Sequence, residues 1–342
     1  MNSFGHNFRV TLFGESHGPV VGVVLDGVPA GIPLTEEDFA EDIARRAPGA
    51  AGKDDGLGAK GLTPRREADK PRIISGLYEG HTTGAPLTIE FDNADIRSED
   101  YEVFEDIPRP GHVDYVASVK YAGLNDPRGG GHFSGRLTLP VVAAGVVAKK
   151  LIGPISLDAH IVALGGSEDP EKWAELIEQV TKDGDSLGAV IECAVSGPVQ
   201  APGAKPAPLP IGLGEPFWDS VESLVSHAIF AIPGVRGIEF GDGFKAASMK
   251  GSEHNDPLSE TGPVKNGAGG VGGGLTNGAP IVFRVAFKPT SSISKPQKTW
   301  NFTEGREDTL AIKGRHDVCF ARRCPVIVEA MTAIVIADLI AG

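Results

Sequence analysis

Apolar residues recur along the chain at two spacings, and each spacing predicts one type of secondary structure. Short β-branched runs bounded by Gly, Pro or Asp predict strands at 7–13, 19–29, 86–91, 188–197 and 279–287. Apolar residues three and four positions apart predict helices at 35–46, 112–124, 136–152, 169–182, 215–232 and from Pro325 onward. The two patterns alternate, so the sequence predicts a mixed α and β class.

The helix predicted at 35–46 carries clear start and stop signals. Thr35 and Asp38 form a capping-box pattern, and Ala47-Pro48-Gly49 ends the helix. Arg45 and Arg46 fall in its last turn, where compensation of the helix dipole is the simplest interpretation. The polar, glycine-rich segment 49–62 follows and could form a lid.

A strand, a proline-rich turn and a helix occur twice in the chain. The segment "GVVLDGVPAGIPLTEEDF" is echoed by "GAVIECAVSGPV", followed later by "GEPFWDSVESL". This similarity indicates an internal duplication. No linker divides the two halves, so we expect one domain over residues 1–342.

Charge and cysteine content narrow the possible partners and location. The formal net charge of −13 argues against nucleic acid as the main partner, although local arginines could bind an anionic small molecule. The three cysteines are sparse and odd in number, which argues against a disulfide framework. We therefore expect buried thiols in a reducing compartment. The apolar segment 325–342 is interrupted by Glu329 and Asp338 and is too short to span a bilayer. With no signal peptide visible, the sequence predicts a cytoplasmic protein without membrane contact.

Two glycine motifs match known patterns only in part. Gly14-x-Ser16-x-Gly18 has the spacing of a nucleophile elbow, which needs a helix after the serine, but a second strand is predicted there. The run "GAGGVG" at 267–272 satisfies G-x-G-x-x-G, yet Lys288 stands about where a dinucleotide-binding fold needs an acidic residue. A serine hydrolase and a Rossmann domain are therefore poorly supported. The second run could instead be a disordered loop or a backbone surface for a flat ring or a phosphate.

Metal and P-loop patterns fail as well. Gly52-Lys53 is followed by Asp54 where a P-loop needs Ser or Thr, and neither the histidines nor the cysteines have zinc-site spacing. What remains is a set of glycine-bounded polar segments that each carry a histidine, an arginine or a lysine: 14–18, 63–67, 109–114, 128–136, 288–293 and 314–317. Together they indicate an anion site assembled from several loops and supplied with acid-base groups.

These segments resemble a known family. "GESHGPVVGVVLDGVP", "GGHFSGRLTLPVVAAGVV" and "GRHDVCFARRCPVIVEAM" are similar to the three signature regions of the chorismate synthase family. "RRE", "TTG", "RPGHVDY", "GGVGGG" and "KPTSSI" occur in the expected order between them. The resemblance extends from Phe4 to about Asp338.

The resemblance implies an activity and a fold. The expected enzyme is a carbon-oxygen lyase of the shikimate pathway, which makes chorismate from 5-enolpyruvylshikimate-3-phosphate by anti-1,4-elimination of phosphate. Reduced FMN is required without net redox change. The expected fold is an α+β, β-α-β sandwich, a helical layer between two antiparallel sheets with an internal pseudo-repeat. A homotetramer supplied by an external NAD(P)H flavin reductase is implied as well.

The resemblance also implies residue roles. The substrate ligands would be Ser16, Arg46, Arg65, Arg66, Arg109, Ser134, Arg136 and Arg315. His17 would donate a proton or a hydrogen bond to the leaving phosphate, His112 would face the flavin, and Asp317 would help to remove the ring proton. The flavin ligands would be His112, Gly269, Gly270, Gly273, Gly274, Lys288, Thr290, Ser291, Ser292 and Arg315. Several guanidinium groups suit a substrate that carries one phosphate and two carboxylates.

The chain departs from the family pattern at a few positions. Ala47 replaces a third basic residue, His132 stands where arginine is common, and Leu137 replaces an acidic residue. Cys324 and Thr332 differ at positions expected to serve packing. A module that binds a phosphorylated ligand without catalysis is the main alternative to an enzyme, but a simple binder needs no His17, His112 and Asp317. Asp317 could instead cap a helix or pair with an arginine.

Overall fold

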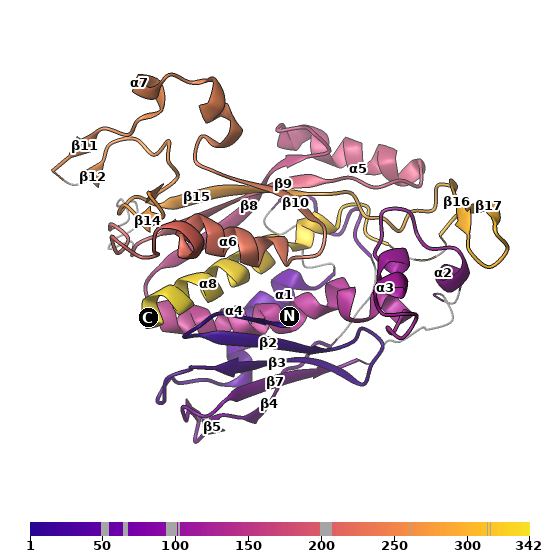
Figure 1. Cartoon of the computed structure of the whole chain (residues 1–342), viewed down its shortest axis with the longest axis horizontal. Helices are drawn as coiled ribbons and strands as arrows, with labels where there is room; N and C mark the ends of the chain where they lie inside the picture. Colours follow the sequence, from indigo (N-terminus) through magenta and orange to yellow (C-terminus); the bar gives the residue numbers. More distant parts are fainter. Residues whose placement is uncertain are drawn as a thin grey trace.

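Two antiparallel sheets enclose a layer of helices in the computed structural model of the chain (Figure 1). The structure describes residues 1–48, 55–63, 68–93, 101, 103–198, 207–260, 262–312, 314 and 316–342. The first sheet lies at the bottom of Figure 1 and the second at the top, with the helices between them. This arrangement is the predicted β-α-β sandwich.

The first sheet is built from the N-terminal part of the chain. Its strands are β1 (Ser3–Phe4), β2 (Arg9–Gly14), β3 (Val20–Asp26), β7 (Leu87–Asp92) and β4 (Arg72–Ser75), in that spatial order. Leu87, Ile89 and Phe91 of β7 are fully buried while their neighbours are not, which is the alternation expected of a sheet with one face on the core. The strands predicted at 7–13, 19–29 and 86–91 are confirmed.

The second sheet has the order β10 (Val235–Phe240), β15 (Ile281–Phe287), β9 (Ala189–Ser196) and β8 (Ser156–Leu164). Alternate residues of β9 and β15 are buried, and the strands predicted at 188–197 and 279–287 are confirmed. The sequence pattern did not reveal β8 and β10. In β8 the polar residues Asp158 and His160 face outward and break up the apolar run.

The helical layer contains α1 (Ala40–Arg46), α4 (Thr138–Ile152), α6 (Val221–Phe230) and α8 (Pro325–Ala341). Helices α4 and α8 are buried over most of their length, as is typical of helices at the centre of a domain. They approach closely because position 145 is glycine: a Cβ there would lie 2.4 Å from the Cβ of Ala330. The predicted helices at these positions are confirmed.

The remaining elements are short and connect the layers. They are β5 (Leu77–Tyr78), β6 (His81–Thr82), α2 (Val103–Asp106), α3 (Asp114–Lys120), α5 (Trp173–Lys182), α7 (Gly251–His254), β11 (Leu258–Ser259), β12 (Gly262–Pro263), β13 (Val271–Gly272), β14 (Leu275–Thr276), β16 (Gln297–Asn301) and β17 (Arg306–Leu310). Short 3₁₀ helices lie at Glu36–Phe39, Arg128–Phe133, Gly135–Leu137, Pro170–Lys172, Phe217–Asp219, Gly243–Ser248 and Phe320–Arg323.

Two predictions from composition can be compared with the structure. Cys193, Cys319 and Cys324 are free and buried, and burial raises the pKa of each thiol, that of Cys319 to about 12. The predicted buried thiols are confirmed. None of the helices in the described part of the chain has the length and apolar character needed to cross a membrane.

The buried carboxylate of Asp338 ties the beginning of the chain to its last helix. Its Oδ1 accepts hydrogen bonds from the backbone N–H groups of His6, Asn7 and Phe8, at 2.9, 2.6 and 2.8 Å. These three donors directly precede β2, so Asp338 fixes where the chain enters the first sheet. Charge-assisted bonds of this kind offset the cost of burying the acid.

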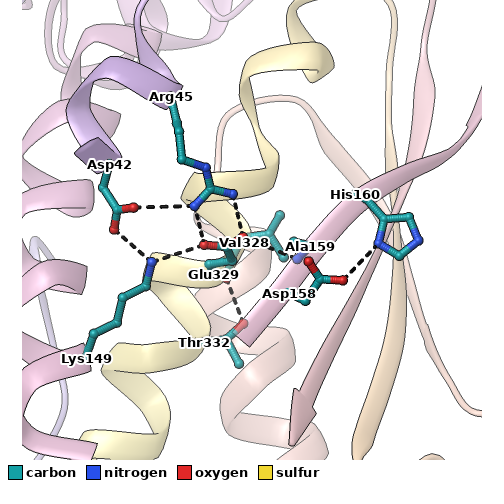
Figure 2. A network of polar contacts seen from close by, with 9 residues as sticks. All are labelled: Asp42, Arg45, Lys149, Asp158, Ala159, His160, Val328, Glu329 and Thr332. Carbon is teal, nitrogen blue, oxygen red and sulfur yellow. Dashed lines mark hydrogen bonds and ion pairs between the residues drawn. The ribbon is translucent and has the colours of Figure 1, made fainter. Parts of the chain in front are cut away.

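Glu329, the second acid of α8, holds the helical layer together through a charged network (Figure 2). Both of its oxygens accept hydrogen bonds from Arg45 of α1 at 2.7 Å, and Lys149 of α4 lies 3.0 Å away. Lys149 also contacts Asp42 at 2.7 Å, and the N–H of Ala159 in β8 donates to Glu329 at 3.3 Å. The network therefore links three helices to the second sheet, and Arg45 does more than compensate the dipole of its own helix.

Replacing Glu329 by Ala should lower the free energy of unfolding by about 3–5 kcal/mol, because Arg45 and Lys149 would lose their shared buried partner. Chemical denaturation in urea would measure the change. Glu178→Ala is the matched control, since Glu178 forms an exposed pair with Lys182 and its loss should change little. Equal destabilisation by the two variants would contradict the assigned role of the network.

Candidate active site

Ser16 lies in a turn between two strands, which decides how its motif is interpreted. Gly14 ends β2 and pairs with Val21 of β3, so a strand, and not a helix, follows Gly18. A nucleophile elbow needs the helix, and the motif therefore lacks the context of a serine hydrolase. The backbone N–H of Ser16 donates to the carbonyl of Gly131 at 3.1 Å, which joins this turn to the glycine run at 129–131.

The glycine run 129–131 lies between the two predicted catalytic histidines. All three glycines have positive φ, a conformation that side chains rarely adopt. A Cβ at Gly129 would lie 2.6 Å from His17 Nε2, and one at Gly130 would lie 3.9 Å from His112 Nε2. Only glycine can fit at position 129. The run thus brings the segments 14–18, 109–114 and 128–136 into one site.

His112 is held by a buried acid–arginine pair. Its Nδ1 lies 2.5 Å from Asp114 Oδ1, and Arg109 binds both oxygens of the same carboxylate, Nε to Oδ2 at 2.7 Å and one terminal nitrogen to Oδ1 at 2.8 Å. Burial lowers the pKa of His112 below 6.5, and the cations Arg109 and Lys288 act in the same direction, while Asp114 opposes them. Burial would raise the pKa of Asp114, but the hydrogen bonds from Arg109 and His112 outweigh it and lower that pKa strongly. The pair is therefore ionic, and His112 is neutral at pH 7.

The Arg109 guanidinium contacts several protein groups. Besides Asp114 it donates to Ser292 Oγ at 3.1 Å, and it lies 4.5 Å from the centre of the Phe104 ring. The structure places Arg109 as a partner of Asp114, and its predicted contact with the substrate stays a prediction.

The segment 288–292 docks on the loop that carries His112. Lys288 Nζ donates to the carbonyl of Gly111 at 2.8 Å and contacts Ser291 Oγ, which itself donates to Gly111 at 2.7 Å. Burial lowers the pKa of Lys288, and Arg236 lowers it further. Among the described residues, Thr290 Oγ1 is buried without a hydrogen-bond partner. A cluster of two cations, with an unsatisfied hydroxyl two residues along the chain from Lys288, suits an anionic ligand.

A cavity of about 630 Å³ adjoins this cluster. His112, Ser134, Lys288 and Arg236 line it, together with apolar side chains of β2, α4, α6 and α8 such as Leu12. Its size and its mostly apolar lining with a few convergent polar groups are those of a site for a small molecule. Three of the predicted ligands therefore share one cavity.

Arg46 and Arg136 meet at a buried carboxylate that sequence reasoning missed. Asp69 Oδ2 lies 3.3 Å from one terminal nitrogen of Arg46, and Asp69 Oδ1 forms an ion pair with Arg136. All three side chains are buried, and Asp69 adopts a positive φ of 42° that costs energy outside glycine. Ser134 lies beside them and accepts a hydrogen bond from the N–H of Arg136 at 3.2 Å.

Asp317 is buried and paired. Its Oδ1 accepts from the backbone N–H of Thr63 at 2.8 Å, and its Oδ2 accepts from Arg323 at 2.6 Å. An arginine partner was one of the alternatives left open by the sequence, and Arg323 supplies it. Asp317 thereby anchors the segment that ends at Thr63.

Several predicted residues lie outside the described part of the chain: Arg65, Arg66 and Arg315, and residues 49–54 of the predicted lid. The rest of that segment, from Asp55 to Leu62, packs on the region after Asp317. Arg322 Nε binds Asp55 at 2.6 Å, and the N–H of Val318 donates to the carbonyl of Gly61 at 2.8 Å.

The glycines predicted to approach the flavin ring lie far from His112 within this chain. Gly269 and Gly270 contact the beginning of β15, whereas Lys288 follows its end, about 20 Å away at 3.3 Å per residue. Gly273 and Gly274 form the turn between β13 and β14. Figure 1 shows β14 toward the left and α3 toward the right of the molecule. Neither pair lines the cavity beside His112.

Two departures from the family pattern have structural explanations. His132 Nδ1 contacts the carbonyl of Gly14 at 2.8 Å, so it fastens the glycine run to the end of β2. Leu137 is buried against the core, where an acid would need a partner. Both residues serve packing around the site.

Asp69, Asp114 and Arg236 are the charged residues that sequence reasoning missed. Asp114 belongs to the quoted segment 109–114, and its spacing from Arg109 and His112 would have permitted a contact, but spacing alone could not show one. Asp69 is distant in sequence from the arginines that it contacts, and Arg236 is distant from Lys288, whose pKa it lowers, so only the fold reveals them.

Comparisons with known proteins show the family of this chain. Residues 8–341 match the family model described as chorismate synthase. A chorismate synthase of Chitinophaga pinensis is 54% identical over 341 residues, which cover 99% of this chain and 96% of the relative. One of Korarchaeum cryptofilum is 42% identical over 365 residues, covering 98% and 96%.

A solved structure agrees as well. The crystal structure titled as chorismate synthase superposes with a TM-score of 0.69 at 25% identity and covers 98% of this chain and 92% of its own. The family match, the relatives and the fold all point the same way: the chain belongs to the chorismate synthase family.

Proposed function

We propose that the cavity bordered by His112, Ser134 and Lys288, together with the adjoining Arg46–Asp69–Arg136 cluster, is the active site of the family reaction. That reaction is the elimination of phosphate from 5-enolpyruvylshikimate-3-phosphate to give chorismate, a step of the shikimate pathway that leads to the aromatic amino acids. The observation that carries the proposal is the convergence of His17, His112 and the glycine run from three distant segments.

The family uses reduced FMN, and the residues present suit this cofactor. Thr290 Oγ1 lacks a partner among the described residues, and positive charge is supplied by Lys288, two residues earlier in the chain, and by Arg236, which lowers the pKa of Lys288. We assign the flavin phosphate to Lys288, Thr290, Ser291 and Ser292, and the ring system to the cavity beside His112. When bound, the reduced flavin supplies electron density that assists the elimination.

The substrate is a polyanion, so guanidinium groups must hold it. Arg46, Arg109 and Arg136 are the described candidates, and Arg65, Arg66 and Arg315 complete the proposed set. Asp69 orients Arg46 and Arg136 and neutralises part of their charge. The positive charge that remains can attract an incoming anion. Ser16 and Ser134 serve as hydrogen-bonding groups beside the substrate, without forming a covalent intermediate.

Three groups handle protons in this proposal. His17 donates to the leaving phosphate, because it lies on the glycine run that joins both parts of the site. His112 is neutral and accepts a proton or a hydrogen bond in the cavity. Asp317 assists removal of the ring proton, and its bond to Arg323 must then weaken or shift during turnover.

The assembly and the electron source are also proposed. We expect the chain to act as one domain, because α8 contacts both halves through Glu329 and Asp338.

A homotetramer would cover exposed apolar side chains such as Phe217, Trp218 and Phe244, and it would let Gly269–Gly274 of one subunit approach the cavity of another. Sedimentation velocity tests this, since a monomer at micromolar concentration would contradict it. A separate cytoplasmic NAD(P)H flavin reductase would supply the electrons.

The purified protein, mixed anaerobically with chemically reduced FMN and 5-enolpyruvylshikimate-3-phosphate, should form chorismate and free phosphate in equal amounts. Absorbance and a phosphate assay would measure the two products. Oxidised FMN with NADPH alone should give no turnover. Tight binding of both ligands without product would favour the binding-module alternative, and intrinsic turnover with NADPH would remove the external reductase.

Replacing His112 by Ala should lower kcat by about 10²–10⁴-fold in a folded protein, the usual contribution of an acid-base group. Because the pKa of His112 is lowered, the neutral form persists below pH 6.5, and activity should fall only as pH drops through that lower value. The pH–rate profile of wild type and variant measures this. His160→Ala, at an exposed histidine of β8, is the control and should change neither rate nor profile.

Replacing Arg136 by Ala should weaken substrate binding about 10–100-fold, because a charge-assisted contact is lost and Asp69 keeps only Arg46 as its partner. Isothermal titration with 5-enolpyruvylshikimate-3-phosphate would measure the dissociation constant. Arg72→Ala, which removes an exposed arginine paired with Glu90, should leave it unchanged. Equal affinity of Arg136→Ala and wild type would take Arg136 out of the site.

A further inference from the structure

The side chain of His112 has two ring nitrogens in different surroundings. Nδ1 faces the carboxylate of Asp114, whereas Nε2 faces Gly130. The His112 side chain itself lines the cavity. Among the described residues, the hydrogen-bond partners of this ring all lie at Nδ1. Which nitrogen carries the proton therefore decides whether the cavity meets a proton donor or a proton acceptor.

Two groups compete for Nδ1. Asp114 Oδ1 lies at 2.5 Å and a terminal nitrogen of Arg109 at 3.0 Å. The ionised carboxylate can only accept, and the guanidinium can only donate. If Nδ1 were unprotonated, its lone pair would face an anionic oxygen at the shorter distance, a repulsive contact. A proton on Nδ1 turns this contact into a charge-assisted hydrogen bond.

Arg109 keeps the carboxylate of Asp114 ionised. Its Nε and its backbone N–H both point to Asp114 Oδ2, at 2.7 and 3.1 Å, and its terminal nitrogen points to Oδ1 at 2.8 Å. These donors cannot become acceptors, so they keep the acid ionised and fixed in place. Among the described residues at Oδ1, the imidazole alone can change its tautomer, so it must adapt to the carboxylate.

We propose that Asp114, held by Arg109, is a positioning residue that keeps the proton of neutral His112 on Nδ1 and thereby presents Nε2 to the cavity as a proton acceptor. This inference rests on the proposed function only for its consequence in catalysis. A ligand N–H or O–H beside Nε2 would donate to it, and a proton taken up there would be stabilised across the ring by Asp114. The charged groups that face the ring are Asp114, Arg109 and Lys288.

The wild-type protein provides the first test. Nitrogen-15 NMR of histidine-labelled protein, free of ligands and near pH 7.5, reports which ring nitrogen is protonated, and a spectrum of His112→Ala identifies the His112 signals. We expect the Nδ1–H tautomer. An Nε2–H tautomer would overturn the proposal whether or not any variant folds.

Asp114→Asn provides the second test. The single amide oxygen should take the Oδ2 position, where two fixed donors converge, so that the amide nitrogen faces Nδ1. His112 should then carry its proton on Nε2, and kcat should fall by about 10²–10⁴-fold with little change in KM. An unchanged tautomer together with unchanged kcat would contradict the proposal.

Asp158→Asn is the matched control, since Asp158 lies 3.4 Å from His160 at an exposed position of β8. It should leave the His112 spectrum and the turnover unchanged. Thermal unfolding of Asp114→Asn shows whether the fold is retained. The tautomer is read without substrate or flavin, so its outcome is separate from that of the proposed function, which fails if wild type forms no chorismate.

Discussion

A buried carboxylate shared by two cationic or N–H-donating side chains is the interaction on which this structure depends. Glu329 joins Arg45 to Lys149 in the helical layer, Asp69 joins Arg46 to Arg136, and Asp114 joins Arg109 to His112. Removing charges from water is costly, and only close, multiply hydrogen-bonded geometry offsets that cost. Each acid therefore fixes its partners in one arrangement, which suits a site that must be rigid before its ligands bind.

Arg45 and Arg46 connect the core to the site. They are neighbours at the end of α1, yet Arg45 turns to Glu329 between the helices while Arg46 turns to Asp69 beside the cavity. The last turn of α1 is thus held by two acids, Glu329 in the helical layer and Asp69 beside the cavity. Arg46 and Arg136 share one acid, Asp69, so their cluster keeps a net positive charge within a chain whose formal net charge is −13.

Local patterns predicted much of the fold because most strands and helices have one buried face. The alternation in β7, β9 and β15 and the apolar length of α4 and α8 could be read directly from the residues. Strands β8 and β10 were not predicted because their alternation is disrupted. Outward polar residues interrupt it in β8, and a bulge between Val235 and Gly237 interrupts it in β10. The order of the layers came from the family resemblance, since no local pattern encodes it.

The site was predictable as a set of segments but not as a geometry. Histidines and arginines next to glycines indicated loops that bind anions, and the structure does bring His17, His112, Ser134 and Lys288 together around one glycine run and one cavity. The sequence did not show which residues form ion pairs or hydrogen bonds with these side chains. Asp69 and Asp114 looked like ordinary loop acids, and the distance of Gly269–Gly274 from His112 depends on the length of β15.

The bond network at Asp338 has a consequence for the order of folding. The donors at His6, Asn7 and Phe8 lie 330–332 residues from their acceptor along the chain. Bringing together groups so far apart in sequence costs loop-closure entropy before any bond is gained, and such contacts slow folding. Asp338 can accept these bonds only once α8 lies against the first sheet, so the entry of the chain into β2 becomes fixed late in folding.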